Sequence, residues 1–359
     1  MKIAMFGHKT VLSRSGGVEV VVRELSTRMA ALGHEVTCYN LGGQPESYQG
    51  VSLKPVPAFG GKGLSAVTAG FFAALAASFS DADVVHIHAE GPAFFCWIPR
   101  LFGKRVIVTV HGLDWQRAKW CRSLGRFYIR AGEKAAVRFA DGIIVLSRNL
   151  RQYFLDTYGR ETVYIPNGIT RPEPAAPALI RELGLEKDSY LLFLGRLVPE
   201  KEIHTLITAF RGLDTGKKLV IAGASSDTDC YVRKLKAMAG SDPRILFTGF
   251  AEGQLLSELY SNAYLYILPS RVEGMPISLL EAMSFGNCCL VSDIPELAEV
   301  VEDHGITVPC GNAPALRAAL EALLADPATV ARHKAAAADF ICGKSDWNTI
   351  VEKTLELYR

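Results

Sequence analysis

The stretch YLLFLGRLVPEK, Tyr190–Lys201, decides how this chain folds. Its first five residues form a continuous apolar run, and the glycine that follows leads into a loop that contains Arg196 and Lys201. A strand that is apolar throughout is buried on both faces, which is typical of a parallel sheet covered by helices. We therefore predict an α/β fold in which this loop, Gly195–Lys201, follows the carboxyl end of a strand, where open parallel sheets bind ligands.

Nine further apolar runs alternate with helical patterns from one end of the chain to the other. They are Lys2–Phe6, Glu35–Tyr39, Asp83–His88, Arg105–Val110, Gly142–Leu146, Lys218–Ala222, Ile245–Phe247, Ala263–Leu268 and Cys288–Val291. Repeated strand–helix–strand units predict doubly wound sheets. A turn signal followed by a proline-rich stretch, residues 165–177, separates two series of strands. We predict two Rossmann-like domains, residues 1–168 and 169–345, with a ligand cleft between them. The last helix, 346–358, could complete either domain.

Length and composition exclude several classes of protein. The chain has 359 residues, of which 49% are hydrophobic and 21% charged, so we expect two globular domains rather than disorder. The net charge of +2 gives no support for nucleic-acid binding. The eight cysteines show no CxxC pair, which favours reduced thiols in the cytoplasm. The apolar stretch Ala66–Phe79 is too short to cross a bilayer, and we expect no signal peptide.

The cations of the loop Gly195–Lys201, called here the cationic loop, suit a diphosphate ligand. Arginine can bind such a group through two parallel hydrogen bonds, and lysine acts as a point charge. The alternative is that Arg196 and Lys201 are solvated surface side chains. Their position after a buried strand favours the binding role.

A second candidate is the glycine loop SGGVE, Ser15–Glu19, between the first strand and the next helix. Gly16 and Gly17 let backbone amides approach a ligand closely, and the helix that follows offers a positive end to phosphate. The spacing is not GxGxxG, so it gives little support to a dinucleotide site. An ordinary strand-to-helix turn explains the glycines equally well.

The most specific pattern is the glutamate motif EGMPISLLE, from Glu273 to Glu281. Pro276 suits the first position of a helix, which puts Glu273 in the preceding loop and Glu281 in the second helical turn. The amides of Gly274 and Met275 would then face an anionic or hydroxyl-rich ligand. A glutamate can also stand near a helix start merely to complement the helix dipole, but that accounts for one glutamate and not for the whole motif.

Together, the glycine loop, the cationic loop and the glutamate motif resemble the large retaining glycosyltransferase family 4, which has the GT-B architecture. The resemblance covers nearly the whole chain. It implies that Arg196 and Lys201 neutralise the diphosphate of a nucleotide-sugar donor and that the glycine loop contacts the phosphates. It further implies that Glu281 binds the ribose, that Glu273 faces the donor sugar, and that the last helix crosses back to the first domain.

One residue departs from the family pattern. Glu202 follows Lys201 where family members commonly have glycine. Its carboxylate adds a negative charge near the expected diphosphate. The donor site is therefore expected to keep its affinity only if the Glu202 side chain points away.

A histidine in the first half also matches the family. His111 follows the strand Arg105–Val110, at the place where the family has a histidine close to the transferred sugar. We expect it to donate a hydrogen bond to the donor sugar or phosphate, or to shield the reacting carbon. A histidine whose hydrogen bonds are satisfied by backbone groups is the alternative.

The bend after the strand Ile245–Phe247 is a further candidate. By resemblance, Gly249 and Phe250 lie beside the nucleobase, which is recognised partly through backbone groups. For that reason the identity of the base is not readable from side chains. A plain turn at a strand end is an equally good explanation.

Neither candidate for a metal site is convincing. His86 and His88 are two residues apart in a strand and share a face, but no third ligand has suitable spacing. Asp227 and Asp229 have the spelling of a metal-binding DxD motif, but they follow Ala224-Ser225-Ser226 in an expected surface loop. We therefore expect a reaction that needs no metal or other cofactor.

A basic stripe along one predicted helix depends on no resemblance. Cations recur at steps of three or four residues, with Glu133 as the only acid among them, at Lys119, Arg122, Arg126, Arg130, Lys134 and Arg138. Aromatic residues, including Trp115 and Phe127, lie nearby. Such a helix suits an anionic membrane surface or a pyrophosphate-linked acceptor. A solvated helix face is the alternative.

The sequence thus predicts transfer of a sugar from a nucleoside diphosphate sugar to an acceptor hydroxyl, in polysaccharide or lipid-linked glycan assembly. By resemblance, the anomeric configuration is retained, and Glu273, His111, Arg196 and Lys201 are the catalytic candidates. The expected partners are the donor, a carbohydrate or lipid-linked acceptor and a membrane surface. Two alternatives are a nucleotide-sugar 2-epimerase on the same fold and a non-catalytic sugar-binding protein.

Overall fold

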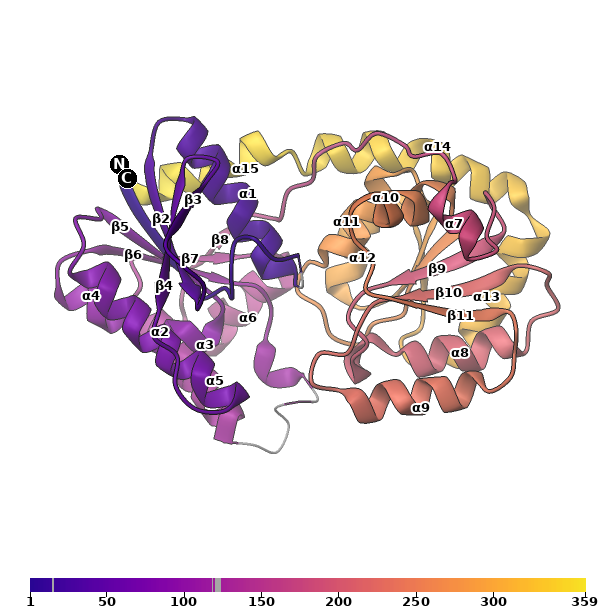
Figure 1. Cartoon of the computed structure of the whole chain (residues 1–359), viewed down its shortest axis with the longest axis horizontal. Helices are drawn as coiled ribbons and strands as arrows, with labels where there is room; N and C mark the ends of the chain where they lie inside the picture. Colours follow the sequence, from indigo (N-terminus) through magenta and orange to yellow (C-terminus); the bar gives the residue numbers. More distant parts are fainter. Residues whose placement is uncertain (15, 118, 120–123) are drawn as a thin grey trace. The chain divides into compact units, whose positions relative to one another are not determined.

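The computed structural model describes residues 1–14, 16–117, 119 and 124–359. Contacts between residues divide the chain into two compact units (Figure 1). Unit 1 consists of Met1–Gly168 together with Trp347–Arg359, and unit 2 consists of Ile169–Asp346. In the described part of the chain, every helix is too short or too polar to cross a membrane.

Unit 1 is built on an eight-stranded sheet with the order β3-β4-β2-β1-β5-β6-β7-β8. All neighbouring strands run parallel except β3 and β4, which are antiparallel. The strands are β1 (Lys2–Phe6), β2 (Glu35–Leu41), β3 (Glu46–Tyr48), β4 (Val51–Val56), β5 (Val84–His88), β6 (Arg105–Val110), β7 (Gly142–Val145) and β8 (Val163–Tyr164).

Helices cover both faces of the unit 1 sheet, as Figure 1 shows for α2–α5 on one side and α1 with α15 on the other. The helices are α1 (Gly17–Ala31), α2 (Lys62–Ser78), α3 (Glu90–Ala93), α4 (Trp97–Leu101), the 3-10 turn η1 (Asp114–Gln116), α5 (Leu124–Phe139), α6 (Arg148–Tyr158) and α15 (Trp347–Tyr358). Apolar side chains of β1, β5, β6 and β7 pack against α2 and α5 in a continuous core. Burial of this apolar surface is the main force that holds the layers together.

The last helix, α15, contacts the rest of unit 1 through hydrogen bonds at its carboxyl end. The Tyr358 hydroxyl lies 2.6 Å from Nδ1 of His86, and the Arg105 guanidinium donates to the carbonyl of Leu357. A Cβ on Gly168 would overlap the Trp347 ring, so the chain returns to unit 1 in close contact with the point where it leaves. The carboxyl-terminal segment therefore completes the first fold rather than the second.

Unit 2 is built on a six-stranded, wholly parallel sheet with the order β11-β10-β9-β12-β13-β14. The strands are β9 (Tyr190–Leu194), β10 (Lys218–Ala222), β11 (Ile245–Gly249), β12 (Leu265–Leu268), β13 (Cys289–Ser292) and β14 (Ile306–Val308). In Figure 1, α8 and α9 lie on one side of this sheet, and α10 and α11 lie on the other. Both units are therefore doubly wound α/β domains, as the apolar runs predict.

The helices of unit 2 precede β9, connect successive strands of the sheet, or, in the case of α13 and α14, follow the last strand β14. They are α7 (Leu179–Glu182), η3 (Pro199–Lys201), α8 (Ile203–Arg211), α9 (Asp229–Ala239), α10 (Gly253–Asn262), α11 (Ile277–Ser284), α12 (Pro295–Val301), η4 (Glu302–His304), α13 (Ala313–Ala325) and α14 (Pro327–Lys344). The cationic loop follows β9, and the glutamate motif follows β12. Because β9 and β12 are neighbours in the sheet, these two loops emerge at the same edge.

Two glycines let chain segments cross closely at the strand ends. A Cβ on Gly223, after β10, would overlap the carbonyl oxygen of Gly195, after β9. In unit 1, a Cβ on Gly7 would overlap the carbonyl oxygen of His88, and Gly7 has a φ of +106°. Only glycine fits these places, because any side chain would push apart the loops that carry the candidate site residues.

The predicted strands are all present, but four observed strands were not predicted. The strands β3 and β4 form an antiparallel edge, where β3 is largely exposed and β4 contains Lys54 and Pro55. The strands β8 and β14 have only two and three residues. Edge strands lack the continuous apolar run that marks strands buried on both faces, so the pattern used for prediction does not detect them.

Candidate functional site

A buried ion pair joins the cationic loop to the glutamate motif in unit 2. Nζ of Lys201 lies 2.5 Å from Oε1 of Glu273, and their side chains are only 9% and 10% exposed. Lys201 ends η3, and Glu273 lies in the loop before α11. Oppositely charged groups with so little access to water are costly to separate, because either one alone would be an uncompensated buried charge. The fold thus brings together two candidate residues that are 72 positions apart.

Two more candidates lie on the elements that carry this pair. Arg196 is half-buried and precedes Lys201 in the cationic loop. Glu281 lies in the second turn of α11, and its Oε2 accepts a hydrogen bond of 3.2 Å from the Tyr260 hydroxyl. Burial, together with the nearby Glu281 charge, raises the pKa of Tyr260 well above its ordinary value, so the phenol remains a donor. The sequence analysis missed Tyr260, which lies in α10 and holds the Glu281 carboxylate.

The start of α11 differs by one residue from the prediction. The helix begins at Ile277, and Pro276 stands before it with an extended ψ of 120°. Its carbonyl accepts hydrogen bonds from the amides of Leu279 and Leu280, which makes it the cap of the first turn. Gly274 and Met275 are buried in the preceding loop, next to the positive end of α11.

The Glu202 carboxylate is held by three neighbours. It accepts hydrogen bonds from Nε of Arg271 at 2.8 Å and from the Thr205 hydroxyl at 2.6 Å, and it lies 3.2 Å from Nε2 of His204. Burial acts to raise the pKa of Glu202, but the hydrogen bonds from Thr205 and Arg271 outweigh it and hold the pKa below its ordinary value. The charge is thus paired within its own surroundings.

The backbone of Glu202 explains why glycine suits this position. Glu202 has a φ of +53°, in the left-handed region that side chains disfavour. It is the single residue between the end of η3 and the start of α8. The sequence departs from glycine here at a cost in backbone conformation, and the contacts with Arg271 and Thr205 offset that cost.

At the edge of the same sheet, β11 ends at Gly249 with a φ of +76°. Phe250 follows it and is 49% exposed. A half-exposed aromatic ring beside a strand end offers a flat apolar face, which is suitable for a nucleobase.

In unit 1, the glycine loop leads into α1 with Gly16 as the residue before the helix and Gly17 as its first residue. Ser15 lies outside the described residues. Glu19, in the first turn, is only 7% exposed, and its Oε1 accepts a hydrogen bond of 3.2 Å from the amide of Lys9. The carboxylate therefore occupies part of the positive helix end that the sequence analysis assigned to phosphate.

Four histidines of unit 1 are buried: His8, His86, His88 and His111. The ring of His88 links two of them, because its Nδ1 lies 3.1 Å from Nε2 of His111 and its ring lies 4.1 Å from that of His86. Burial lowers the pKa of His111 to about 4 and that of His86 to about 3. These rings are neutral at pH 7 and act there as hydrogen-bonding groups rather than as cations.

His86 and His88 share a face of β5 as predicted, and both ring nitrogens of His86 have hydrogen-bond partners. Its two ring nitrogens bond to Tyr358 and Thr109. Among the described residues, no group of three or more histidines, cysteines or acids could hold a metal ion. Asp227 and Asp229 lie in an exposed turn at the start of α9.

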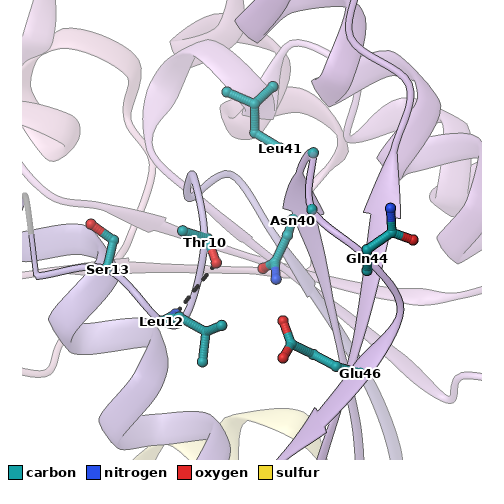
Figure 2. Close-up of a pocket in the computed structure, with 9 residues that line it drawn as sticks. Thr10, Leu12, Ser13, Asn40, Leu41, Gln44 and Glu46 are labelled. Atoms are coloured by element: carbon teal, nitrogen blue, oxygen red, sulfur yellow. Dashed lines mark hydrogen bonds between the residues drawn. The ribbon is translucent and has the colours of Figure 1, made fainter.

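A pocket of about 290 Å³ with a mixed polar and apolar lining lies beyond β1 and β2 in unit 1 (Figure 2). Thr10 and Ser13 line it from the loop after β1, and Asn40, Gln44 and Glu46 line it from β2 and the chain that follows. Figure 2 shows Asn40 between Thr10 and Glu46. The Asn40 side chain is held by a 2.9 Å hydrogen bond to Nε2 of His8. Such a lining of hydroxyl, amide and carboxylate groups can bind the hydroxyls of a sugar.

Four members of the basic stripe, Arg126, Arg130, Lys134 and Arg138, lie on α5, whereas Lys119 precedes the helix instead of belonging to it as predicted. The guanidinium groups of Arg126 and Arg130 each lie 5.1 Å from the centre of the Trp115 ring. Lys119 is exposed, and Arg122 lies outside the described residues. On the same helix, Leu124 is 91% exposed and Phe127 is 77% exposed. Cations and uncovered apolar side chains thus occur together at the start of α5.

Models of known protein families match both units of the chain. The model of the Glycosyltransferase Family 4 matches residues 15–171, and the model of Glycosyl transferases group 1 matches residues 177–340. The chain belongs to the family 4 glycosyltransferases. Over 389 residues it is 28% identical to alpha-maltose-1-phosphate synthase of Mycobacterium tuberculosis, covering 100% of this chain and 99% of that protein.

Solved structures show the same fold. Sucrose-phosphate synthase of Thermosynechococcus elongatus is similar with a TM-score of 0.86 and 23% identity, over 100% of this chain and 98% of the other. The Anabaena protein HepE, solved in complex with UDP-glucose, is similar with a TM-score of 0.82 and 18% identity, over 99% of each chain. The fold of this family 4 glycosyltransferase is therefore GT-B.

Proposed function

We propose that this glycosyltransferase moves a sugar from a nucleoside diphosphate sugar to an acceptor hydroxyl with retention of configuration. The observation that carries the proposal is the buried pair of Lys201 and Glu273 at the carboxyl edge of the unit 2 sheet, with Arg196 in the same loop. The guanidinium of Arg196 and the ammonium of Lys201, placed at such an edge, can bind the negative charges of a diphosphate leaving group. The bound UDP-glucose of the Anabaena relative in fold supports a donor of this class.

Each donor-site residue has a proposed task. Arg196 and Lys201 stabilise the negative charge that grows on the diphosphate as the glycosidic bond breaks, and the glycine loop contributes backbone amides. Glu281, oriented by Tyr260, accepts hydrogen bonds from the ribose diol. Phe250 and Gly249 lie beside the base, and the segment Gly274–Pro276 lies beside the sugar and phosphate.

Glu273 is proposed to bind the donor sugar through hydrogen bonds. Its carboxylate is paired with Lys201, an arrangement that does not resemble the pair of carboxyl groups in a glycoside hydrolase. A donor phosphate oxygen is proposed to take the proton of the acceptor hydroxyl on the face that the leaving group occupies. The neutral His111 is proposed to donate a hydrogen bond to the reacting sugar, and the reaction is proposed to need no metal.

The acceptor is proposed to be a carbohydrate or a lipid-linked carbohydrate. The pocket beside Asn40 supports a hydroxyl-rich ligand on unit 1. The start of α5 supports a membrane surface, because its arginines would face anionic headgroups while Leu124 and Phe127 enter the interface. The protein would then work in the cytoplasm, peripherally at the inner face of the membrane.

Sedimentation with vesicles tests the membrane proposal. The protein should sediment with vesicles that contain phosphatidylglycerol and remain in solution with pure phosphatidylcholine. The double variant Arg126→Glu/Arg130→Glu and the double variant Leu124→Asp/Phe127→Asp should both lose binding. The matched control, Lys234→Glu/Lys236→Glu on the exposed face of α9 in unit 2, should keep it. Equal binding by all four proteins would refute the proposal.

A product assay separates transfer from the two alternatives. Donor alone and donor with candidate sugar acceptors are incubated with the protein, and the products are resolved by mass spectrometry and NMR. A transferase releases nucleoside diphosphate and forms a glycoside only when an acceptor is present, with the donor's anomeric configuration. Isomerised donor without acceptor would indicate the epimerase, and binding without any product would indicate the sugar-binding protein.

A further inference from the structure

Two buried carboxyl groups of unit 1 take no part in the proposed chemistry. Glu90 begins α3 and Glu133 lies in the middle of α5, and both are fully buried. The helices cross closely, because a Cβ on Gly132 would overlap the carbonyl oxygen of Glu90. The two carboxyl groups therefore face each other with no access to water, in a place where two negative charges would repel strongly.

Counting hydrogen-bond donors distinguishes the two groups. Glu133 accepts from the Trp115 indole at 3.1 Å, from the Tyr153 hydroxyl at 2.9 Å and from the Tyr158 hydroxyl. Glu90 accepts one bond, of 2.7 Å, from the amide of Asp114 to its Oε2, while its Oε1 is buried and meets no donor. An ionised carboxylate needs donors at both oxygens, and only Glu133 has them.

We propose that Glu90 is a protonated carboxylic acid which donates its proton to the Glu133 carboxylate, and that this pair is a positioning device for the loop that carries His111. The orphaned Oε1 then becomes a donor, and every buried oxygen of the pair has a partner. Burial first, and then the hydrogen bond to Glu133, raise the pKa of Glu90 well above its ordinary value, in agreement with this assignment.

The pair fixes the loop at two points. Asp114 bonds to Glu90 through its backbone amide, and Trp115 bonds to Glu133 through its indole, so these two residues of η1 are held in place three and four positions after His111. Trp115 also carries the guanidinium groups of Arg126 and Arg130. The same carboxyl pair therefore orients both His111 and the basic face of α5. The effect on transfer rests on the proposed function, whereas the proton and the loop anchor do not.

Other ionisable groups surround the pair. The acids, phenols and cations that face it from η1, α5 and α6 are Asp114, Arg117, Arg130, Tyr153 and Tyr158. Asp114 is paired with Arg117 at 2.9 Å, and burial raises the pKa of Tyr158 to about 12, so the phenol remains a hydrogen-bond donor to Glu133 near pH 7.

Two isosteric variants test the proposal with opposite expectations. In Glu90→Gln the amide can donate to Glu133 and accept from Asp114, so folding and transfer should stay within about twofold of wild type. In Glu133→Gln one oxygen becomes a donor that meets the Trp115 indole or the Glu90 proton. That mismatch should lower kcat on the order of tenfold or more, with a smaller change in the donor KM.

Two readouts are independent of activity. The infrared carbonyl band of a protonated carboxylic acid should be present in wild type at pH 7 and absent in Glu90→Gln. The thermal midpoint of Glu90→Gln should exceed that of wild type increasingly above pH 4.5, because ionising Glu90 in the unfolded chain favours unfolding, and the two midpoints should converge below it.

A third variant covers the possibility that Glu133→Gln does not fold. Trp115→Phe removes the indole donor while keeping an aromatic ring beside Arg126 and Arg130, and it should increase amide exchange at residues 113–117 and lower kcat. The proposal is overturned if Glu90→Gln is as damaging as Glu133→Gln, if the acid band survives in Glu90→Gln, or if Trp115→Phe leaves exchange and kcat unchanged. If no variant and no wild-type sample transfers sugar, the infrared and exchange results still decide the assignment, and only the proposed function fails.

Discussion

The two units treat buried polar groups in opposite ways. In unit 2, Lys201 is paired with Glu273 and Glu202 is paired with Arg271, so these two buried carboxylates each have a counter-charge. In unit 1, the buried histidines meet one another, and burial drives their pKa values down until they are neutral. A protein can keep a charge out of water only with a counter-charge or enough hydrogen-bond donors, and otherwise the group gives up the charge. Unit 2 therefore offers paired charges to a ligand, and unit 1 offers neutral hydrogen-bonding groups.

The largest effect should come from breaking the unit 2 ion pair. Lys201→Met leaves Glu273 buried without its cation, which should cost about 3 kcal/mol of unfolding free energy and abolish transfer. The double variant Lys201→Met/Glu273→Gln removes both charges and should recover most of the stability without recovering activity. Urea denaturation and a transfer assay measure the two effects. A single variant as stable as wild type would show that the pair is not closed off from water.

A smaller effect is expected when the unit 1 histidines are charged by acid. Their folded pKa values, about 4 for His111 and about 3 for His86, lie below the ordinary value of about 6.5. Above pH 6.5 both states are neutral and stability is complete, and as the pH falls toward 4 only the unfolded chain takes up protons. Stability should therefore fall by roughly 2 kcal/mol per histidine by pH 4.5.

Urea denaturation at intervals from pH 7.5 to 4.5 checks this dependence. The variant His111→Asn should lose less unfolding free energy than wild type over this pH range, by the contribution of one histidine. Lys201→Met serves as the contrast, since its loss of stability does not arise from a histidine. If wild type and His111→Asn gave parallel profiles, burial of His111 would not be the cause of the acid sensitivity.

The smallest effect should come from the strained position beside the ion pair. Glu202→Gly relieves a φ of +53° but loses the contacts with Arg271 and Thr205, so its stability should change by less than about 1 kcal/mol. Glu202→Ala loses the same contacts without gaining the freedom of glycine, and should be about 1 kcal/mol less stable than the glycine variant. Thermal unfolding of the pair measures the difference. Equal midpoints would mean that the backbone of Glu202 carries no strain.

The features predicted best from the sequence are the strands that are buried on both faces. The strands Lys2–Phe6, Arg105–Val110, Tyr190–Leu194 and Lys218–Ala222 have the predicted bounds, because both faces of each are covered and the apolar run is complete. The strand β4, next to the edge strand β3, was missed because it carries Lys54 and Pro55. The division into two sheets follows from the same runs.

The contacts of the candidate site were harder to predict, because they join distant segments. Lys201 and Glu273 were each found as candidates, but their ion pair is visible only once β9 and β12 are neighbours. The ion pair of Glu202 with Arg271 likewise joins segments that are distant in the sequence. The left-handed φ of Glu202 could not be predicted from the sequence, where the only sign of it is a glutamate at a position that favours glycine. Glu90 offered no signal, since a lone glutamate reads as a surface residue until its burial is known.

The most direct test of the central claim is calorimetric titration with UDP, ADP, GDP and dTDP and with a sugar conjugate of each. Wild type should bind one nucleotide selectively, and Arg196→Ala and Glu281→Ala should each weaken that binding on the order of tenfold or more, as expected when a charged hydrogen-bonding partner is lost. Asp227→Asn, in the exposed turn before α9, is the matched control and should bind as wild type does. Folded wild-type protein that binds none of these ligands, or variants that bind them unchanged, would contradict a nucleotide-sugar donor site in unit 2.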